Sequence, residues 1–226
     1  MSLFITVEAT CGKCGTVAKV DFASSVNADR RPDLRQAILD ETFQATVCAS
    51  CGTTIRLPAH ITYLDIGRHQ WILVEDAARL ADWHAVEAEA VDLFKEAFGP
   101  QAPSLQQEIG ASLTARLVFG WPALREKLIA QEEGMDDVVL ELLKVGVVRN
   151  VPSSPLSDGT ELRLVQADQT NLILRWINSS TEQGLSDLTL DRSLYEDLAA
   201  NQEPWEDLKA DLTAGLFVDM NRILRE

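Results

Sequence analysis

The first sixty residues alternate between apolar and polar side chains in short segments. Between Phe4 and Ala9, for example, Ile5, Val7 and Ala9 share one side, and Thr6 and Glu8 lie on the other. A period of two is typical of half-buried β-strands. The pattern predicts four strands, at 4–9, 16–22, 43–47 and 53–57. A short helix beginning at Pro32 is predicted between the two pairs of strands, since proline suits the first helical position.

The spacing of apolar residues changes after residue 75. Two further strands are expected at 61–66 and 70–74, and beyond them apolar residues recur every three or four positions. This period indicates helices. It predicts helices over 75–98, 104–119, 122–131 and 135–148. In the second of these, Leu105, Ile109, Leu113 and Leu117 form an i, i+4 ladder that ends at Gly120.

The last third of the chain returns to strand patterns and then to helices. Residues 151–159 are rich in Pro, Ser and Asp-Gly, which favours a linker. Strands are predicted at 161–165, 172–177 and 185–190. Helices are predicted at 193–200 and from 205, and Gly215 interrupts the latter before a last segment at 216–224. The expected fold class is therefore α+β. Its expected regions are a zinc-ribbon-like four-cysteine module with an inserted helix at 1–75, a helical region at 76–150, and a small antiparallel sheet with C-terminal helices at 151–226.

All four cysteines lie in two Cys-x-x-Cys-Gly segments, and these carry the clearest chemistry of the chain. The ligands expected for a metal ion are Cys11, Cys14, Cys48 and Cys51. Two intervening residues let one tight turn direct both sulfurs of a pair to the same point, and two such pairs make a tetrahedral Zn²⁺ site. Four thiolates leave no open position for water or substrate, so a structural zinc is expected rather than a catalytic one.

The 33 residues between the pairs exceed the usual spacing of a zinc ribbon, which is about 15–20 residues. The extra length agrees with the inserted helix. The two cysteine pairs, their wide separation and the N-terminal segment resemble the CpXC-domain proteins of bacteria and archaea. The resemblance covers roughly the first half of the chain. It implies a metal-binding domain without an established activity.

A redox dithiol is the main alternative for the cysteines. Cys11-Gly12-Lys13-Cys14 is superficially similar to a thioredoxin-like motif. Such a motif opens a helix, however, whereas the residues after Cys14 alternate as a strand does. A redox role also leaves the second matching pair without an explanation.

Charge is distributed unevenly along the chain. The protein has 226 residues and a net charge of −15. Residues 1–75 carry 7 basic and 8 acidic side chains, whereas residues 76–226 carry 13 and 27. Nucleic-acid binding needs a basic surface, so the charge argues against it. Arg30, Arg31 and Arg35 form the one local basic cluster, expected to be a solvated helix face or a small anion contact.

The sequence gives little evidence for an enzyme active site. It has no phosphate-binding glycine loop and no His-Glu-x-x-His motif. His60, His69 and His84 lack metal-type spacing, and core burial is the expectation for the tryptophans. We therefore expect a zinc-binding, non-catalytic protein-interaction or scaffold protein. A transcription-associated nucleic-acid factor and a thiol or zinc redox sensor are the alternatives.

The cysteines and the hydropathy of the chain indicate the cellular compartment to expect. Metal-type cysteine pairs and the absence of a secretory leader suggest the cytoplasm. No apolar segment approaches the ~20 residues that span a bilayer. The expected partner is another protein, and the sequence does not determine the oligomeric state.

Overall fold

The computed structural model describes residues 4–150 and 159–224. The predicted linker at 151–159 falls outside the described residues except for Gly159. Within the described residues, no helix is both long and apolar enough to cross a membrane.

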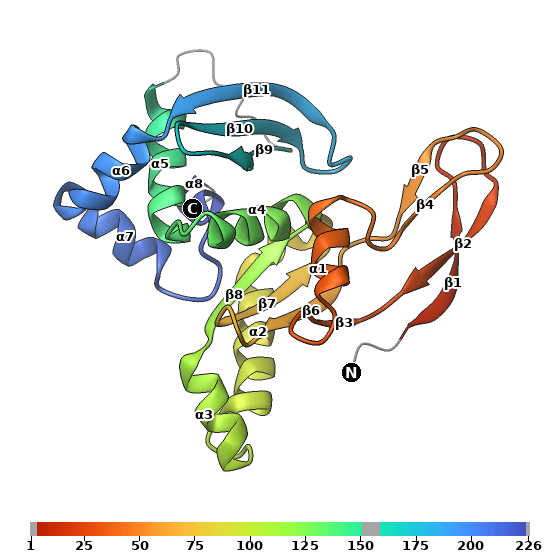
Figure 1. Ribbon diagram of the computed structural model, residues 1–226, viewed down its shortest axis with the longest axis horizontal. Coiled ribbons are helices and arrows are strands. Elements are labelled where there is room, and N and C mark those ends of the chain that lie inside the picture. Colours follow the sequence, from red (N-terminus) through yellow and green to blue (C-terminus); the bar gives the residue numbers. More distant parts are fainter. Residues whose placement is uncertain (1–3, 151–158, 225–226) are drawn as a thin grey trace.

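Two β-hairpins project from one side of the molecule (Figure 1). The first pairs β1 (Ile5–Thr10) with β2 (Val17–Phe22), and the second pairs β4 (Ala45–Val47) with β5 (Thr54–Arg56), both antiparallel. The helix predicted at Pro32 is present as α1 (Pro32–Leu39). The alternation in the sequence thus predicted all four strands of the two hairpins.

A four-stranded mixed sheet forms the centre of the molecule. Its order is β3–β6–β7–β8, built from β3 (Ser25–Asn27), β6 (Ile61–Asp65), β7 (Gln70–Glu75) and β8 (Thr114–Phe119). The middle pair, β6 and β7, is antiparallel, and both outer pairs are parallel. Buried strands with continuous apolar runs, such as Trp71–Val74, are typical of a sheet covered on both faces.

Helices cover both faces of this sheet. One face packs against α1 and α4 (Trp121–Glu132), with Ile61 and Ile72 facing Ile38 and Leu128 in one buried cluster. The other face packs against α2 (Trp83–Phe98). A 3-10 helix, η1 (Ala77–Asp82), precedes α2, so the single helix predicted over 75–98 is two elements.

The helix predicted over 104–119 is wrong in its second half. The structure ends α3 (Ser104–Ser112) and continues as strand β8. Three residues of β8, Leu117, Val118 and Phe119, are almost fully buried beside β7. Pairing with a strand distant in sequence therefore overrides the local apolar ladder. The region 76–150 is consequently not helical throughout, and its strand β8 pairs with β7 across residue 75. The three-residue strand β3 was not predicted.

The last third contains the expected three-stranded antiparallel sheet. Its order is β11–β10–β9, formed by β9 (Thr160–Ala167), β10 (Asn171–Asn178) and β11 (Gly184–Asp191). The accompanying helices are α5 (Asp137–Asn150), α6 (Ser193–Ala200), α7 (Glu206–Leu212) and α8 (Met220–Leu224), with the short η2 (Glu203–Trp205) before α7. The interruption predicted at Gly215 is present, and the second part begins at Met220 and not at Leu216. Figure 1 shows α4 between this part and the central sheet.

A buried network of charged side chains joins α4 to its neighbours. Lys144 Nζ on α5 lies 2.8 Å from Glu126 Oε1 on α4 and 2.8 Å from Glu141 Oε2. Arg163 Nη1 on β9 lies 3.0 Å from the same Glu126 oxygen. The network consists of the acidic residues Glu126, Asp137, Glu141, Glu161 and Asp219 and the basic residues Arg116, Lys127, Lys144 and Arg163. Ions removed from water need such close partners.

Replacing Glu126 with Ala should destabilise the fold strongly. The substitution leaves Lys144 and Arg163 without a shared carboxylate, and it removes the acceptor for the amide of Leu164. Breaking a buried ion pair costs about 3–5 kcal/mol. Urea unfolding of the variant measures the loss. Glu108→Ala, at an exposed helix position, is the matched control and should change the free energy of unfolding by less than about 0.5 kcal/mol.

Glu141 should make stability depend on pH. Burial raises the pKa of Glu141 to about 7, from an ordinary value of 4.5. The buried network contains five carboxylates and four cations. The carboxylate of Glu141 faces Lys127, Lys144 and the amide of Met220. Between these two pH values the folded state therefore holds a proton on Glu141 that the unfolded chain has released. The stability that this proton contributes is present in full below about pH 4.5 and is lost as pH rises to about 7.

In Glu141→Gln the side chain is neutral at every pH, so the decline across this window should flatten by on the order of 1–3 kcal/mol. Urea unfolding at intervals from pH 5 to 8 measures the difference, with Glu108→Gln as the control. A variant with the same pH slope as the wild type would show that Glu141 is not the responsible group.

Candidate metal centre

Each hairpin turn carries one cysteine pair, and the two turns have the same backbone geometry. The amide of Cys11 donates to the carbonyl of Thr16 at 2.9 Å, and the amide of Cys48 donates to the carbonyl of Thr53 at 2.9 Å. The amides of Gly15 and Gly52 donate back to the first cysteine of their pair, at 2.8 and 2.9 Å. The same sequence, Cys-x-x-Cys-Gly-Thr, thus closes the same turn twice.

The glycine in each turn is required by the backbone conformation. Gly15 has φ of +73° and Gly52 has φ of +70°, in the left-handed region that residues with a Cβ rarely adopt. A Cβ at either position would meet nothing within 4 Å. The dihedral angle, and not a lack of space, therefore selects glycine here.

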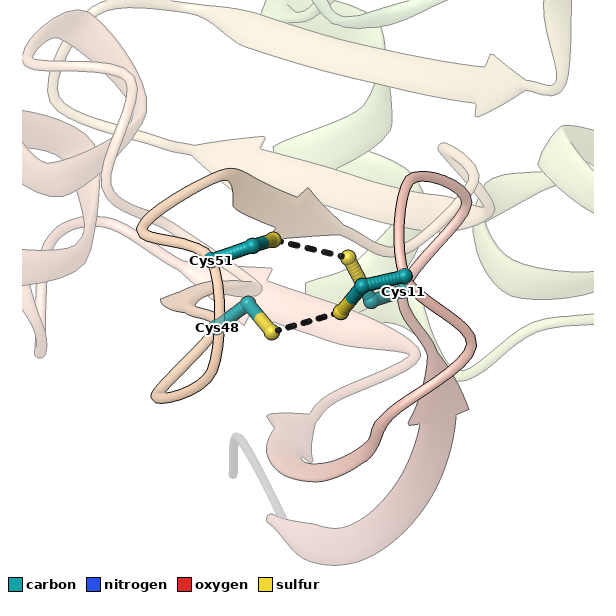
Figure 2. A group of neighbouring side chains, drawn as sticks. Cys11, Cys48 and Cys51 are labelled. Carbon is teal, nitrogen blue, oxygen red and sulfur yellow. Dashed lines mark hydrogen bonds between the residues drawn. The ribbon is translucent and has the colours of Figure 1, made fainter.

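The two turns direct all four sulfur atoms to one point. The sulfurs lie within 4.8 Å of one another. Cys11 Sγ is 3.6 Å from Cys51 Sγ, and Cys14 Sγ is 3.5 Å from Cys48 Sγ, so each close pair joins the two hairpins (Figure 2). A disulfide holds its sulfurs about 2.05 Å apart. Four sulfurs around one tetrahedral ion at ~2.3 Å are ~3.8 Å apart, close to the spacing seen here.

Hydrogen bonds in the turns favour the thiolate form of two cysteines. The hydroxyl and the amide of Thr16 lower the pKa of Cys14 to about 6. Thr53 acts in the same way and lowers the pKa of Cys51. Around Cys48, the amides of Ser50 and Cys51 also favour the thiolate, but burial and the neighbouring sulfurs leave its pKa raised. The thiolate is the form that binds a metal, so the second cysteine of each pair is prepared for ligation.

The cysteines differ in their access to solvent. Cys11 and Cys48 are each 1% exposed, Cys51 is intermediate, and Cys14 is exposed. Besides these cysteines, Ile55 is the one fully buried residue of their apolar cluster, against which Ala9 and Ala18 pack. The hairpins therefore bury little apolar surface around the sulfurs.

The other residues singled out in the sequence lie elsewhere. His60, His69 and His84 are exposed, and within the described part of the chain the cysteines are the one group able to hold a metal ion. Trp71, Trp83, Trp121 and Trp176 are buried, as expected, whereas Trp205 is intermediate.

In the expected basic cluster, Arg30 and Arg31 are exposed and Arg35 is buried. Arg35 is 5% exposed and pairs with Glu132, and Arg31 pairs with Asp33. The prediction of a solvated helix face is therefore wrong for Arg35. A half-buried arginine on β5, Arg56, was missed; a single arginine in a strand gives no sequence signal. The threonine after each Cys-Gly was also missed, although its repetition is visible in the sequence.

Comparison with known proteins identifies the family. The family model of the CpXC protein matches residues 9–144, more than half of the chain. The chain belongs to the CpXC family. The match extends beyond the cysteines, through the central sheet and α4 into α5. No curated protein and no solved structure matched the chain.

Gly52→Ala should weaken the second turn. Alanine pays a steric penalty at positive φ of about 1–2 kcal/mol, so the free energy of unfolding of the hairpin should fall by that amount. Amide hydrogen exchange in β4 and β5 measures it. Gly12→Ala is the matched control, because Gly12 has no positive φ and a Cβ there meets nothing within 4 Å. Equal effects of both substitutions would contradict this role of the dihedral angle.

Proposed function

We propose that Cys11, Cys14, Cys48 and Cys51 bind one zinc ion, and that the ion has a structural role. The observation that carries the proposal is the convergence of four sulfurs from two turns, at spacings that suit tetrahedral thiolate coordination. Four sulfur ligands select zinc or iron–sulfur chemistry over hard cations such as Mg²⁺. Four protein ligands complete the tetrahedron, so no position is open for a substrate.

Zinc would supply the folding free energy that the hairpins lack. Ile55 and the two buried cysteines make up their buried cluster, which is too small to order two hairpins alone. A structural zinc site contributes its binding free energy to folding. The ion would therefore hold the two turns together, and through them the two hairpins.

The function that best suits such a module is non-catalytic binding of another protein. Support comes from large apolar side chains that the hairpins expose: Ile5 at 59%, Val17 at 55% and Val47 at 65%. Each of these side chains stays in contact with water until a partner covers it, so each is a candidate contact. A reducing compartment such as the cytoplasm suits free cysteines that bind metal.

A redox sensor is a second candidate, favoured by one observation. Cys14 is exposed, whereas its neighbour Cys48 is buried 3.5 Å away. An oxidant can reach the sulfur of Cys14, and oxidation to a disulfide would release the ion. A nucleic-acid factor has less support, because Arg31 and Arg35 are already paired with acidic residues.

Protein purified under reducing conditions should contain one zinc ion per chain, and Cys11→Ser or Cys48→Ser should abolish its binding. The reason is that both cysteines are buried ligands that serine replaces poorly. Elemental analysis measures the metal, and hydrogen exchange reports the order of β1, β2, β4 and β5. Loss of metal should unprotect these strands and leave the central sheet protected.

Ala49→Ser is the control, because Ala49 is exposed in the turn between Cys48 and Cys51 and contributes no sulfur. A metal-free wild type with a reversible disulfide would overturn the structural zinc site. Zinc released by mild peroxide and regained with reductant would favour the sensor over the scaffold.

A further inference from the structure

Arg56 is a half-buried arginine without a partner. It ends β5, on the hairpin that carries Cys48 and Cys51. Among the described residues, its guanidinium makes no ion pair, and its Nε is buried without a hydrogen bond. Burial lowers the pKa of Arg56, which is the opposite of what an ion pair does. Buried cations are ordinarily paired, so an unpaired one indicates a missing anion.

Arg56 lines a cavity at the junction of the hairpin, α4 and β10. The cavity has a volume of about 140 Å³, and two more arginines, Arg125 of α4 and Arg175 of β10, line it. Ile38, Leu164 and Ile177 add apolar walls. Three guanidinium groups at one small cavity are unexpected in a chain with a net charge of −15.

The other two arginines are held in place and keep donors free. Arg125 donates Nε to the carbonyl of Leu39 and Nη1 to Glu41, which leaves Nη2. Arg175 donates Nε and Nη2 to Asp187, which leaves Nη1. Gly184 makes room for this arrangement, since a Cβ there would lie 2.8 Å from Arg175 Cδ. Each of the two side chains thus lines the cavity and keeps one terminal nitrogen, Arg125 Nη2 or Arg175 Nη1, without a hydrogen bond among the described residues.

Two carboxylates also line the cavity, and each has a partner. Glu41 lies 2.6 Å from Arg125 Nη1, which neutralises it. Glu182 accepts the amide of Trp121 at 2.9 Å, at the start of α4. Burial raises the pKa of Glu182 and favours its neutral form. Glu41 pairs with Arg125 and Asp187 pairs with Arg175, so Arg56 is the arginine of the three that has no ion pair among the described residues. Burial lowers the pKa of Arg56, and Glu182 and Glu41 offset part of that effect from a distance.

A second cavity, of about 310 Å³, is also lined by Arg56. The two cavities share Arg56, Trp121 and Glu182. Ser179 lines the second one, and its Oγ is buried without a hydrogen-bond partner. This hydroxyl is a second polar group without a hydrogen bond among the described residues, and it lies in a cavity that Arg56 also lines.

We propose that Arg56, Arg125 and Arg175 bind a small anion carrying a phosphate or a carboxylate group. Both groups accept paired N–H donors from guanidinium, which is why arginine recognises them. The cavity at the three arginines is below the 300 Å³ of ordinary ligand pockets, so it takes the charged group alone. The remainder of a larger ligand would extend past Arg56 toward Ser179. The proposal is separate from the metal centre, although the hairpin that positions Arg56 also carries two of the cysteines.

Inorganic phosphate and acetate are the probes that test the site. We expect calorimetry of the zinc-replete full chain, at constant ionic strength in chloride, to detect saturable binding of at least one of them. Arg56→Gln should weaken that binding about tenfold or more, as expected for losing a charge-assisted hydrogen bond. Arg30→Gln is the matched control, since Arg30 is exposed and the substitution changes the charge by the same amount. This variant should bind the probe with the same affinity as the wild type.

Preference for phosphate or for acetate distinguishes the two classes of ligand.

A second measurement is urea unfolding in chloride buffer without either probe. Arg56→Gln should unfold there at the same urea concentration as the wild type or at a higher one, because it removes an unpaired charge. A wild type that binds neither probe overturns the proposal, and so does binding that Arg56→Gln leaves unchanged. Marked destabilisation of Arg56→Gln in chloride would show that Arg56 has a structural partner, and would also overturn it.

Discussion

The convergence of four sulfur atoms between two hairpin turns is the constraint on which the functional part of this protein depends. The hairpins are two separate two-stranded sheets, and a two-stranded hairpin is marginally stable by itself in water. Around the cysteines they bury little apolar surface. At their turns the two hairpins meet through the sulfurs, which come together in pairs across the two turns and not within them.

The base of the hairpin module is held by ordinary packing. Phe43 lies edge-on to Trp121 with ring centroids 5.6 Å apart, and Trp121 Nε1 donates to the carbonyl of Leu57 at 2.9 Å. Trp121 begins α4, the helix that also carries Glu126 and Lys127 into the buried charge network. One helix thus connects the hairpins, the central sheet and the C-terminal sheet. The arginine cavity lies where these parts meet, and the family match extends through α4.

Much of the local structure could be predicted, because its signals are local. The alternation that predicted β1, β2, β4 and β5 records which side chains face inward, and the Cys-x-x-Cys-Gly segments specify turns through a positive φ. Strand β8 could not be predicted in this way. Its apolar ladder suits a helix, and pairing with β7 decides the outcome. Sequence spacing contains no information about that partner.

The sequence by itself determined the four sulfurs, the turns that present them and the type of metal chemistry they suit, because each depends on a few neighbouring residues. The tertiary structure alone decided which sulfurs lie together and that Arg35 is buried against Glu132. It also decided that Arg56 lines a cavity with Arg125 and Arg175 and has no ion pair among the described residues. These features depend on residues far apart in the chain, which come together when apolar surfaces are buried. Burial also determines the energy of a charge, since an arginine that is unremarkable in water needs an anion once it is enclosed.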